Sequence, residues 1–481
     1  MIKEFMRRFK PLEILNEEQV EAIHRGTLNV IETTGVRIEH DRALALFTEH
    51  GCKVDFDNKR VRIPGWLVEE SLHKCPSSFP VKTRDPESDL MIGGNTLYFA
   101  QEVGMHAVDL NTWESRTATL KEHNDAVRVM DALDTVAGLQ AYQFYMDMEG
   151  VPPSMVYLEG LASGIRNTTK MQCFNHMNDS EIFAIKMAKA VGIDLLGGMT
   201  LSPPLTLFTD CCEAGLRFAE AEFPIPIIGG AVMGGTAPVT FAGATVTNNV
   251  EIMAGIVLLQ LFKPGTKVLP VNFVYPMNMR NGNLDFGAMG IALHTAIFNQ
   301  IWRSYGIPRG IMCGGYTSSK KIDFQNAYEK AMMNLIAAIS GTNIAFFQGS
   351  IHGELTYHPV QAVLDDDIAG WIGHFLEGVE VNDETLAIKL INQIGPIPGN
   401  YLNTAHTRKW WKVHFVPKVA DRESYPEWVK KGKKDALTLA KERLEEILAT
   451  HRPKPLTPEQ DEAINEILEE ARIFYREKGM L

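Results

Sequence analysis

Cysteine is scarce in this sequence, and the few cysteines that it has lack the spacing of metal-binding or redox pairs. The chain of 481 residues contains six cysteines and no Cys-x-x-Cys unit. Neither a zinc ribbon nor a disulfide-stapled fold is therefore indicated, and we expect no metal site. This usage of cysteine fits a reducing compartment, so we expect a cytoplasmic protein.

An excess of basic charge and a long apolar run are also missing. Lys and Arg number 47 against 59 Asp and Glu, and the net charge of -12 argues against nucleic acid as the main partner. The basic residues near the start are not followed by the apolar stretch of a secretory signal. The longest apolar run, 252–262, is too short to cross a bilayer, so we expect no membrane partner.

The middle of the chain alternates short apolar runs with longer helical patterns. Such alternation predicts a parallel sheet covered by crossover helices. About eight units over roughly 300 residues fit a closed (β/α)8 TIM barrel better than an open, doubly wound sheet. No Gly-x-Gly-x-x-Gly opens a helix after the first strand, which weakens the dinucleotide-binding alternative. The predicted strands are 136–141, 170–174, 195–200, 225–228, 268–273, 308–312 and 343–347, with a weak eighth unit at 401–403.

The two ends of the chain differ from this middle part. Residues 1–90 mix helical spacing with a small hairpin pattern and predict an N-terminal α+β cap. Residues 91–420 contain the barrel and begin with a strand-rich segment. Residues 421–481 are charged, with apolar positions at helical spacing, and predict a C-terminal helical extension that wraps the barrel or joins an oligomer contact. We expect a homo-oligomer.

The most informative stretch is 341–367. Its apolar run, 343–347, is bounded by glycines and has the pattern of a buried parallel strand, and Pro359 opens an apolar-periodic helix. The polar loop between them contains His352 and Glu354. Because a parallel barrel keeps its active site after its strands, both residues are catalytic candidates. The alternative interpretation is that they are ordinary polar residues of a loop.

Glycines gather after the predicted strand 225–228. Clustered glycines free backbone N–H groups near a helix start, which suits a phosphate, or they allow the close approach of a flat, bulky ligand. The loop lacks the Lys-Ser/Thr pair of a P-loop. Its candidate ligand-facing residues are Gly229, Gly230, Gly234, Gly235 and Thr236.

Aromatic side chains collect near the same predicted strand ends. An aromatic box with few carboxylates is how proteins hold a quaternary ammonium, although a Phe inside a strand is more often part of the core. Gln101 and Gln348 are polar candidates beside this box, and Arg280 could bind a carboxylate. The aromatic residues near these strand ends are Tyr98, Phe99, Tyr142, Phe144, Tyr145, Phe273, Tyr275, Tyr316, Phe347 and Tyr357. Of these, the candidates for substrate binding are Tyr98, Phe99, Tyr142, Phe347 and Tyr357.

Five runs of this sequence resemble the trimethylamine methyltransferase superfamily. They are 234–265, 318–333, 363–370, 379–387 and 415–428, and the likeness spans roughly residues 10–475. The resemblance implies a (β/α)8 barrel that takes a methyl group from an amine and passes it to the Co(I) corrinoid (cobalamin) of a separate carrier protein. No His here stands in the Asp-x-His-x-x-Gly signature of carriers. We therefore expect the corrinoid on a partner and no tightly bound cofactor, with the glycine loop and His352 facing the corrin ring.

One departure from the family bears on the substrate. Its trimethylamine enzymes carry pyrrolysine near the end of the sixth barrel strand, whereas this sequence has ordinary residues at 313–316, where Gly315 is the best local match. Members without pyrrolysine look like demethylases of quaternary amines. A quaternary ammonium already bears its charge and leaves as a neutral amine, so no general acid is required. The protein needs to hold the cation, exclude water and align the reacting atoms.

Three interpretations remain open. The favoured substrate is glycine betaine, the smallest and commonest such compound, which would give dimethylglycine. A larger betaine, such as proline betaine, carnitine or γ-butyrobetaine, would undergo the same reaction. The third interpretation is a non-catalytic betaine-binding protein on the same scaffold, which fold alone does not exclude.

Overall fold

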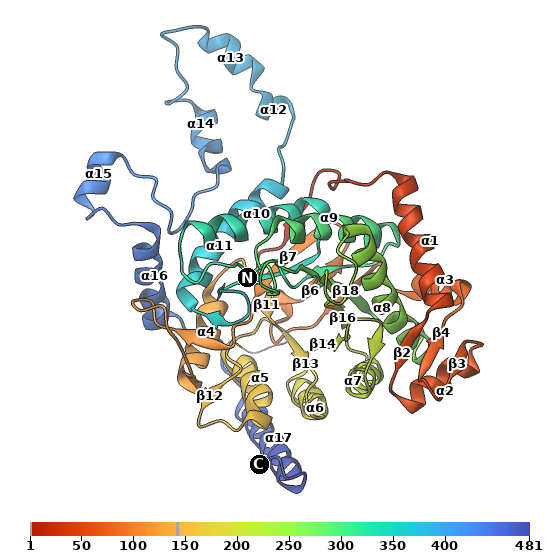
Figure 1. The fold of residues 1–481 in the computed structure, drawn as a ribbon. Coiled ribbons are helices and arrows are strands. Elements are labelled where there is room, and N and C mark those ends of the chain that lie inside the picture. The colour runs from red at the N-terminus through yellow and green to blue at the C-terminus, as the bar shows by residue number, and fades with distance from the viewer. Residues whose placement is uncertain (1, 141–143) are drawn as a thin grey trace.

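The computed structural model describes residues 2–140 and 144–481 (Figure 1). In this part of the chain the central sheet has nine strands, in the order β1-β7-β21-β20-β18-β16-β14-β13-β11, and all neighbours are parallel except β1 and β7. The strands are β1 Phe5–Met6, β7 Thr96–Gln101, β11 Gly138–Leu139, β13 Met171–Asn175, β14 Leu195–Thr200, β16 Ile225–Gly229, β18 Val268–Asn272, β20 Gly310–Ile311 and β21 Ile344–Gln348.

The sheet curls until its parallel edges meet. A parallel bridge joins Phe99 of β7 to Val136, and the backbone N–H of Ala137 donates to the carbonyl of Phe99 over 2.7 Å. The eight parallel strands therefore form a TIM-barrel-like ring, with β20 as the seventh and β21 as the eighth strand in chain order.

All seven strands predicted between 136 and 347 are present, although residue 141 of the first lies outside the described residues. The prediction of an eighth unit at 401–403 is wrong, because those residues form a bend and a turn outside the sheet. The remaining strand is β7, which opens the ring instead of ending it. It was hard to recognise because all six of its residues are buried and short strands flank it on both sides.

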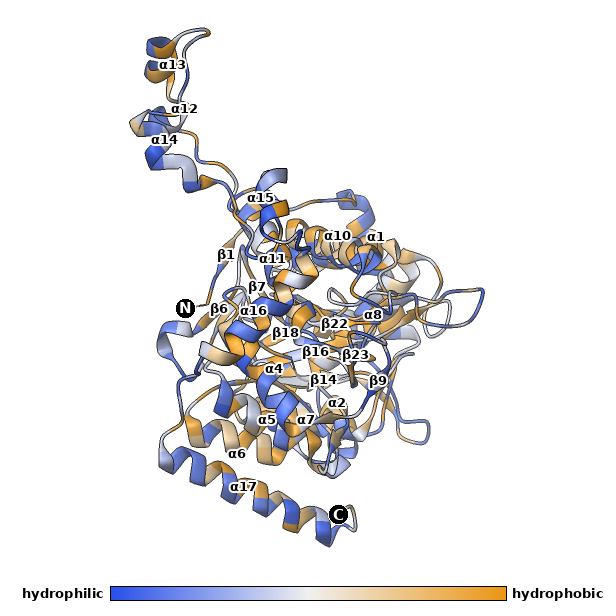
Figure 2. Ribbon diagram, turned by 90° about the vertical axis from the view of Figure 1, so that its left-hand side faces the viewer, coloured by the Kyte–Doolittle hydropathy of each residue, from blue (hydrophilic) through white to orange (hydrophobic). Residues whose placement is uncertain are grey.

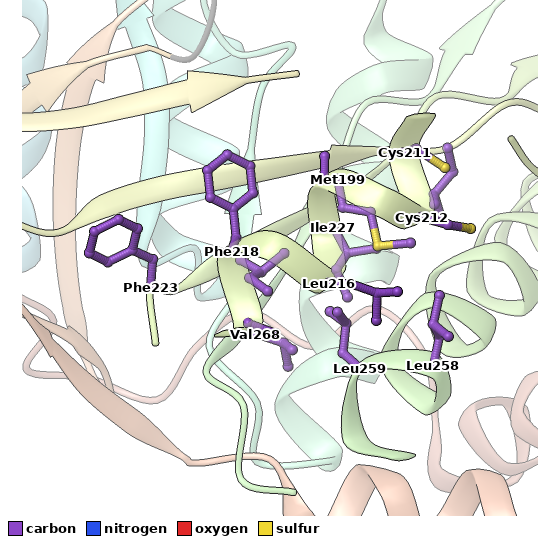
Figure 3. Close-up of a cluster of buried hydrophobic side chains, with 14 of the residues drawn as sticks. Met199, Cys211, Cys212, Leu216, Phe218, Phe223, Ile227, Leu258, Leu259 and Val268 are labelled. Atoms are coloured by element: carbon purple, nitrogen blue, oxygen red, sulfur yellow. The ribbon is translucent and has the colours of Figure 1, made fainter. Parts of the chain in front are cut away.

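Helices cover the outside of the ring. Crossover connections in a parallel sheet place the N-terminus of each helix at the carboxyl end of a strand, so those helix ends mark one face of the ring. Figure 3 shows the layer between strands and helices, where Met199 and Ile227 pack toward Leu216 and Leu259. The helices are α4 Leu120–Ala132, α5 Val156–Asn167, α6 Glu181–Val191, α7 Thr209–Glu220, α8 Phe241–Phe262, α9 Met289–Ser304, α10 Phe324–Ser340 and α11 Pro359–Leu376.

Helix α8 is unusually apolar. Among the described helices it is the one with the length and hydropathy to cross a membrane, with 22 residues, but 78% of the relevant window is buried inside the protein. Helix α8 lies between the ring and three helices of the N-terminal region, α1 Glu17–Thr33, α2 Asp41–Glu49 and α3 Gly65–Lys74. Its composition is that of a core helix.

A hairpin closes one end of the ring. Strands β5 Ser78–Val81 and β6 Leu90–Gly93 pair with each other, and their side chains Phe79 and Ile92 join the apolar cluster of the ring interior. That cluster includes Leu269 and Ile344, which stand at the beginnings of their strands. The hairpin therefore covers the amino ends of the strands, and we call the opposite end, where the strands finish, the mouth.

The terminal regions pack outside the ring. A small sheet of β2 Val36–Ile38, β3 Lys53–Asp55, β4 Arg60–Arg62 and β15 Thr206–Leu207 accompanies α1 to α3. Helix α16 Ala436–Thr450 packs on α4 and α11, and α17 Pro458–Glu477 packs on α5 and α6. Residues 379–416 lie within the predicted barrel region but leave it as a projecting segment, which we call the arm (Figures 1 and 2). The exact boundaries at 90 and 420 stay predictions.

Candidate active site

Loops that follow three adjacent strands meet at the mouth. The backbone N–H groups of His352 and Gly353, after β21, donate to the carbonyls of Ser319 and Thr317, after β20, over 3.0 and 2.8 Å. Gly353 also lies against the ring of Phe286, from the loop after β18, because a Cβ on this glycine would come within 2.5 Å of that ring. These contacts join the three loops into one rim.

Helix α10 anchors this rim from behind. The Glu329 carboxylate accepts from the Thr317 hydroxyl over 2.5 Å and from the backbone N–H of Ser318 over 2.9 Å. Asp323 caps the start of α10 by accepting from the N–H of Asn326 over 2.9 Å. The loop after β20 is thus held to a rigid helix, which is the kind of support that a binding site needs.

Four aromatic rings lie together inside the rim. Tyr275 and Tyr316 are stacked with centroids 6.2 Å apart, and Phe286 meets them edge-on at 5.3 and 5.6 Å. Phe273 contacts Tyr275 at 5.0 Å. We call this group, Phe273, Tyr275, Phe286 and Tyr316, the mouth cage. Rings in edge-on and offset contact present both faces and edges to a ligand.

A fully buried carboxylate stands beside the mouth cage. Glu102 directly follows β7, and its Oε1 accepts from the backbone N–H of Val103 over 3.0 Å and from the Gln140 amide over 2.6 Å. Burial raises the pKa of Glu102 well above its usual range, and these bonds, the Tyr316 hydroxyl and the Lys330 charge oppose that rise only in part.

The nearest buried cation is already engaged. Lys330 donates to the Asp365 carboxylate over 2.7 Å and to the Ser350 carbonyl over 2.9 Å. Among the described residues, no Lys, Arg or His forms an ion pair with Glu102. Glu354, on the rim, adds a second negative group, and burial raises its pKa as well. Within the described part of the chain, the mouth therefore combines aromatic faces with carboxyl groups that form no ion pair.

His352 lies at the rim in a strained conformation. Its φ is +30°, which a non-glycine residue seldom adopts, and two hydrogen bonds from the backbone of 352 and 353 hold it there. Burial lowers the pKa of His352, and the positive charge of Lys320 lowers it further. The imidazole is therefore mainly neutral near pH 7, in a neighbourhood that is locally positive.

The comparison with known proteins decides the family. The family described as trimethylamine methyltransferase (MTTB) matches residues 1–472. The chain belongs to this family. MttB, the trimethylamine methyltransferase of Desulfitobacterium hafniense DCB-2, is 30% identical over 472 residues, which cover 96% of this chain and 94% of that protein. The glycine betaine methyltransferase of D. hafniense Y51 is 31% identical and covers 93% and 95%. The sequence resemblance is confirmed, and the chain is a methyltransferase.

A solved structure shows a looser likeness. Monomethylamine methyltransferase (MtmB) of Methanosarcina barkeri aligns with 97% of this chain and 94% of its own, with 12% identity and a TM-score of 0.45.

Gly315, which the sequence analysis predicted to match the pyrrolysine position, lies at the mouth in a confined place. A Cβ there would come within 2.6 Å of the Phe347 carbonyl oxygen and 2.8 Å of Glu102 Cγ. Any side chain at this position would displace Glu102, so the glycine and the buried carboxylate depend on each other.

Three of the predicted aromatic residues lie away from the mouth cage. Tyr98 points into the ring interior, where its hydroxyl donates to Glu4 over 3.0 Å near the hairpin end. Phe99 and Phe347, with rings 5.7 Å apart, pack in the layer below α10 and α11 together with Phe5. Phe99 and Phe347 share the buried apolar cluster of Tyr275 and Tyr316, but no ring contact among the described residues joins them or Tyr98 to the cage. Their part in substrate binding stays a prediction.

The fourth described candidate, Tyr357, belongs to a neighbouring aromatic cluster. Its ring contacts Phe144 at 5.0 Å and Tyr145 at 5.8 Å, and its hydroxyl lies 3.5 Å from the sulfur of Met130. Tyr142 lies outside the described residues. This cluster follows β11 and β21, so it stands beside the mouth cage without being part of it.

The polar candidates have separate settings. The Gln101 side chain accepts from the backbone N–H of Gln140 over 2.9 Å and so helps to orient the residue that binds Glu102. Gln348 donates to the Thr135 hydroxyl over 3.3 Å, on the side of α11. Arg280 is exposed in the turn that follows β19 Tyr275–Pro276. Of these three residues, Gln101 is the one linked to the Glu102 carboxylate, through Gln140.

The glycines of the loop after β16 have two different settings, close packing for Gly229 and Gly230 and an exposed turn for Gly234 and Gly235. Gly229 is required by packing, because a Cβ there would come within 2.1 Å of Asn248 on α8, and Gly230 lies against the ring of Phe273. Gly234 has a φ of +89° and, like Gly235, is exposed in a turn at the mouth. The Thr236 hydroxyl closes this turn by accepting from the N–H of Val232 over 2.8 Å.

The sequence analysis did not single out Glu102, Gln140 or Phe286 as site residues. Glu102 could have been found from its position, since a carboxylate directly after a buried strand is unusual. That clue depended on recognising β7 as a barrel strand. Phe286 gave no local signal, because it reaches the cage from a long loop between β19 and α9.

Proposed function

We propose that this methyltransferase moves a methyl group from a quaternary amine to the Co(I) corrinoid of a separate carrier protein in the cytoplasm. Glycine betaine is the favoured substrate, and dimethylglycine is the product. The observation that carries the proposal is the buried Glu102 carboxylate beside the mouth cage, with which no Lys, Arg or His of residues 2–140 and 144–481 forms an ion pair. A relative named glycine betaine methyltransferase, similar over nearly the whole chain, supports the choice of substrate.

The mouth supplies what a quaternary ammonium needs. Each aromatic face contributes about 0.5–2 kcal/mol to the binding of a cation. Glu102 supplies the opposite charge in a site of low dielectric, where the attraction is strong. A Co(I) corrinoid on the carrier would supply the nucleophile. The residues of this chain hold the ammonium, exclude water and keep one methyl group toward the open end, and no proton has to move.

The rim also suits the carboxylate of a betaine. The charge of Lys320 makes the rim near His352 positive, and the neutral His352 imidazole can donate a hydrogen bond there. Glu102 and Glu354 supply the carboxyl groups of the mouth, which ionise when a cation binds. A zwitterion that lies across the mouth places each of its charges near the opposite one. In this arrangement His352 binds the carboxylate, and Glu354 strengthens the field at the ammonium.

Gly315 supports a substrate that is already charged. Since a Cβ at this position meets Glu102 and the backbone of Phe347, the large side chain used by the trimethylamine enzymes has no room here. The neutral amine would then lack the group that activates it. A quaternary amine needs no such activation.

The rim is built for the docking of a carrier. Val239, Met289 and Phe324 stand at the starts of α8, α9 and α10, which is the mouth end, and all three are exposed. Met279 and the exposed glycines 234 and 235 continue this apolar, low-relief surface. A surface of this kind fits a flat corrin face and the protein around it. It is the reason for assigning the glycine loop, including Gly229, Gly230 and Thr236, to the corrinoid side.

Product analysis tests the proposal. With a reduced corrinoid carrier, glycine betaine should give dimethylglycine and methylated corrinoid in equal amounts, while trimethylamine gives neither. Turnover of trimethylamine at a comparable rate would contradict the argument from charge. Binding of betaine without any product, with a carrier shown to be active, would favour a binding protein instead.

A further inference from the structure

The arm, residues 379–416, is a folded segment without a core. It contains the short helices α12 Asp383–Leu386, α13 Ile388–Ile394 and α14 Ala405–Trp410, and none of their residues is buried. Isolated helices shorter than about 12 residues are marginal in water, so such helices need a packing partner. Figures 1 and 2 show the three helices of the arm extending away from the barrel wall. At its end the arm returns to the barrel, where the Phe415 ring lies against Gly370 of α11.

The side chains of the arm are those of an interface. Ile397 is 95% exposed and Val379 is 88% exposed, both far from the usual state of an aliphatic residue. A large exposed apolar surface on a soluble protein marks an interaction site. The other exposed apolar residues of the arm are Val381, Leu386, Ile388, Ile391, Tyr401, Leu402, Trp411, Val413 and Val416.

A matching groove lies on the same flank of the molecule. It runs between α10 and α11 at the base of the arm, has a volume of about 400 Å³, and is lined mainly by apolar residues. Trp371 stacks on Phe375 with ring centroids 6.1 Å apart, and both rings are about half exposed. Met332 and Tyr328, one turn apart on α10, extend this apolar face.

We propose that the arm of one copy lies in the α10–α11 groove of a second copy, which returns its own arm in the same way. A twofold pair needs a surface that complements itself, and this chain carries both halves, an arm and a groove, side by side. The arm has roughly 40 residues, more than the 20–30 residues that each side of a stable interface usually contributes. Such an exchange covers both apolar surfaces at once.

The position of the arm favours a second copy over the carrier. The arm leaves from the C-terminal end of α11, which is the end of the barrel opposite the mouth. In Figure 2 the arm departs from the side of β1 and β6. Three short strands at the mouth lie on the other side, namely β9 Ser115–Arg116, β22 Ser350–Ile351 and β23 Thr356–Tyr357. A carrier that delivers its corrinoid to the mouth would not need this surface.

The base of the arm is fixed to the barrel. The backbone N–H of Arg8 donates to the carbonyl of Leu376, just before the arm, over 2.9 Å. After the arm, the N–H groups of Lys418 and Val419 donate to Asp367 over 2.7 and 2.8 Å. These anchors hold both ends of the arm and set the direction in which it projects, as an exchange between copies requires.

Deletion of the arm is the first test. The two anchor points, Asp367 and Leu376, are about 14 Å apart along α11. A Gly-Ser linker of about eight residues can therefore replace 379–414 without strain, and this deletion keeps Phe415, which forms part of the groove wall. Light scattering should give a dimer or a multiple of it for the full chain and half that mass, or less, for the deletion variant, with circular dichroism showing that both are folded.

Point variants test the two halves separately. Ile388→Glu with Ile391→Glu on the arm, and Trp371→Glu in the groove, should each shift the assembly toward monomers by at least tenfold in dissociation constant. Phe56→Glu is the matched control, because Phe56 is exposed to a similar degree on the N-terminal region and should leave the mass unchanged.

Cross-linking identifies the partner directly. Two differently tagged copies, one with Leu402→Cys on the arm and one with Met332→Cys on α10, should be joined by a short bismaleimide, since five of the six native cysteines are buried and the sixth is partly buried. A full chain that stays monomeric at micromolar concentration would overturn the proposal. An arm-deletion variant that keeps the mass of the full chain but no longer transfers the methyl group to the carrier would also overturn it, because the arm would then be a binding site for the carrier. Neither result depends on which amine is the substrate.

Discussion

Two fully buried carboxylates near the carboxyl end of the barrel have opposite surroundings. Asp365, on α11, accepts from Lys330 over 2.7 Å, from the N–H of Gly349 over 2.9 Å and from Gln361 over 2.8 Å. Glu102, at the mouth, accepts from an amide and a backbone N–H and has aromatic neighbours. The first carboxylate is compensated by the protein itself. The second is arranged for a cation that comes from outside.

The largest expected effect is a loss in the free energy of unfolding, and it should differ between variants of Asp365 and Glu102. Asp365→Asn leaves the Lys330 ammonium buried without its partner, and breaking a buried pair in this way costs about 3–5 kcal/mol. Urea unfolding of Asp365→Asn and Glu102→Gln, each compared with wild type, measures the difference. Glu102→Gln should change the free energy of unfolding by less than about 1 kcal/mol, because no ion pair is broken. An equal loss in both variants would make Glu102 a structural residue.

The second effect concerns binding. Glu102→Gln removes the charge that faces the ammonium while it keeps the shape of the side chain. Loss of one partner of a buried charge pair costs about 2 kcal/mol or more, so the dissociation constant of glycine betaine should rise at least roughly 30-fold. Calorimetric titration measures it. Unchanged affinity in a folded Glu102→Gln variant would place the ammonium elsewhere.

Smaller changes are expected at the aromatic walls. Phe286→Leu should weaken betaine binding by roughly 2- to 30-fold, the range of one cation–π contact. Phe347→Leu is the matched control, because this ring packs on Phe99 with centroids 5.7 Å apart, and no ring contact among the described residues joins it to the mouth cage. Weaker betaine binding in Phe347→Leu, with unchanged binding in Phe286→Leu, would favour the aromatic box predicted from the sequence, formed by Tyr98, Phe99, Phe347 and Tyr357.

The smallest effect is expected at the rim. His352→Ala should lower methyl transfer several-fold and leave the free energy of unfolding nearly unchanged, since the backbone of the loop makes its main contacts. Because no proton moves in the reaction, the pH–rate profile should keep both of its limbs, unlike the profile of an enzyme that has lost a general acid. Steady-state assays across pH with saturating carrier would reveal a lost limb, and that would give His352 a proton-transfer role.

The sequence predicted the barrel well because its signals are local. The run 343–347, bounded by glycines, became β21, and the loop with His352 and Glu354 lies at the mouth as the position after a strand implies. The eighth strand was misplaced because a fully buried β7 shows no alternation between polar and apolar residues. The arm was counted as barrel because its exposed apolar residues have the composition of a core.

The aromatic site could be predicted only in part. Phe273, Tyr275 and Tyr316 were among the aromatic residues expected near the strand ends, but the choice of binding residues fell on others. Tyr98 and Phe99 are neighbours on β7, so they point to opposite faces of the sheet, and the pairing with β21 decides which face is inside. Phe286 and Tyr316 meet through loops that are far apart in sequence. Which residue pairs with a buried charge likewise depends on the fold and not on the local sequence. The contrast between Glu102 and Asp365 required the contact between Lys330 of α10 and Asp365 of α11.

Proton release on binding tests the central claim most directly. Burial holds the pKa of Glu102 well above its usual range, and a bound ammonium favours the ionised form, so binding should expel a proton below that raised pKa. Calorimetry in two buffers with different ionisation enthalpies counts this proton. Wild type should release up to one proton, with affinity that rises with pH and levels off above the raised pKa, and Glu102→Gln should release none. Equal proton counts and equal pH dependence in the two proteins would contradict a cation site at Glu102.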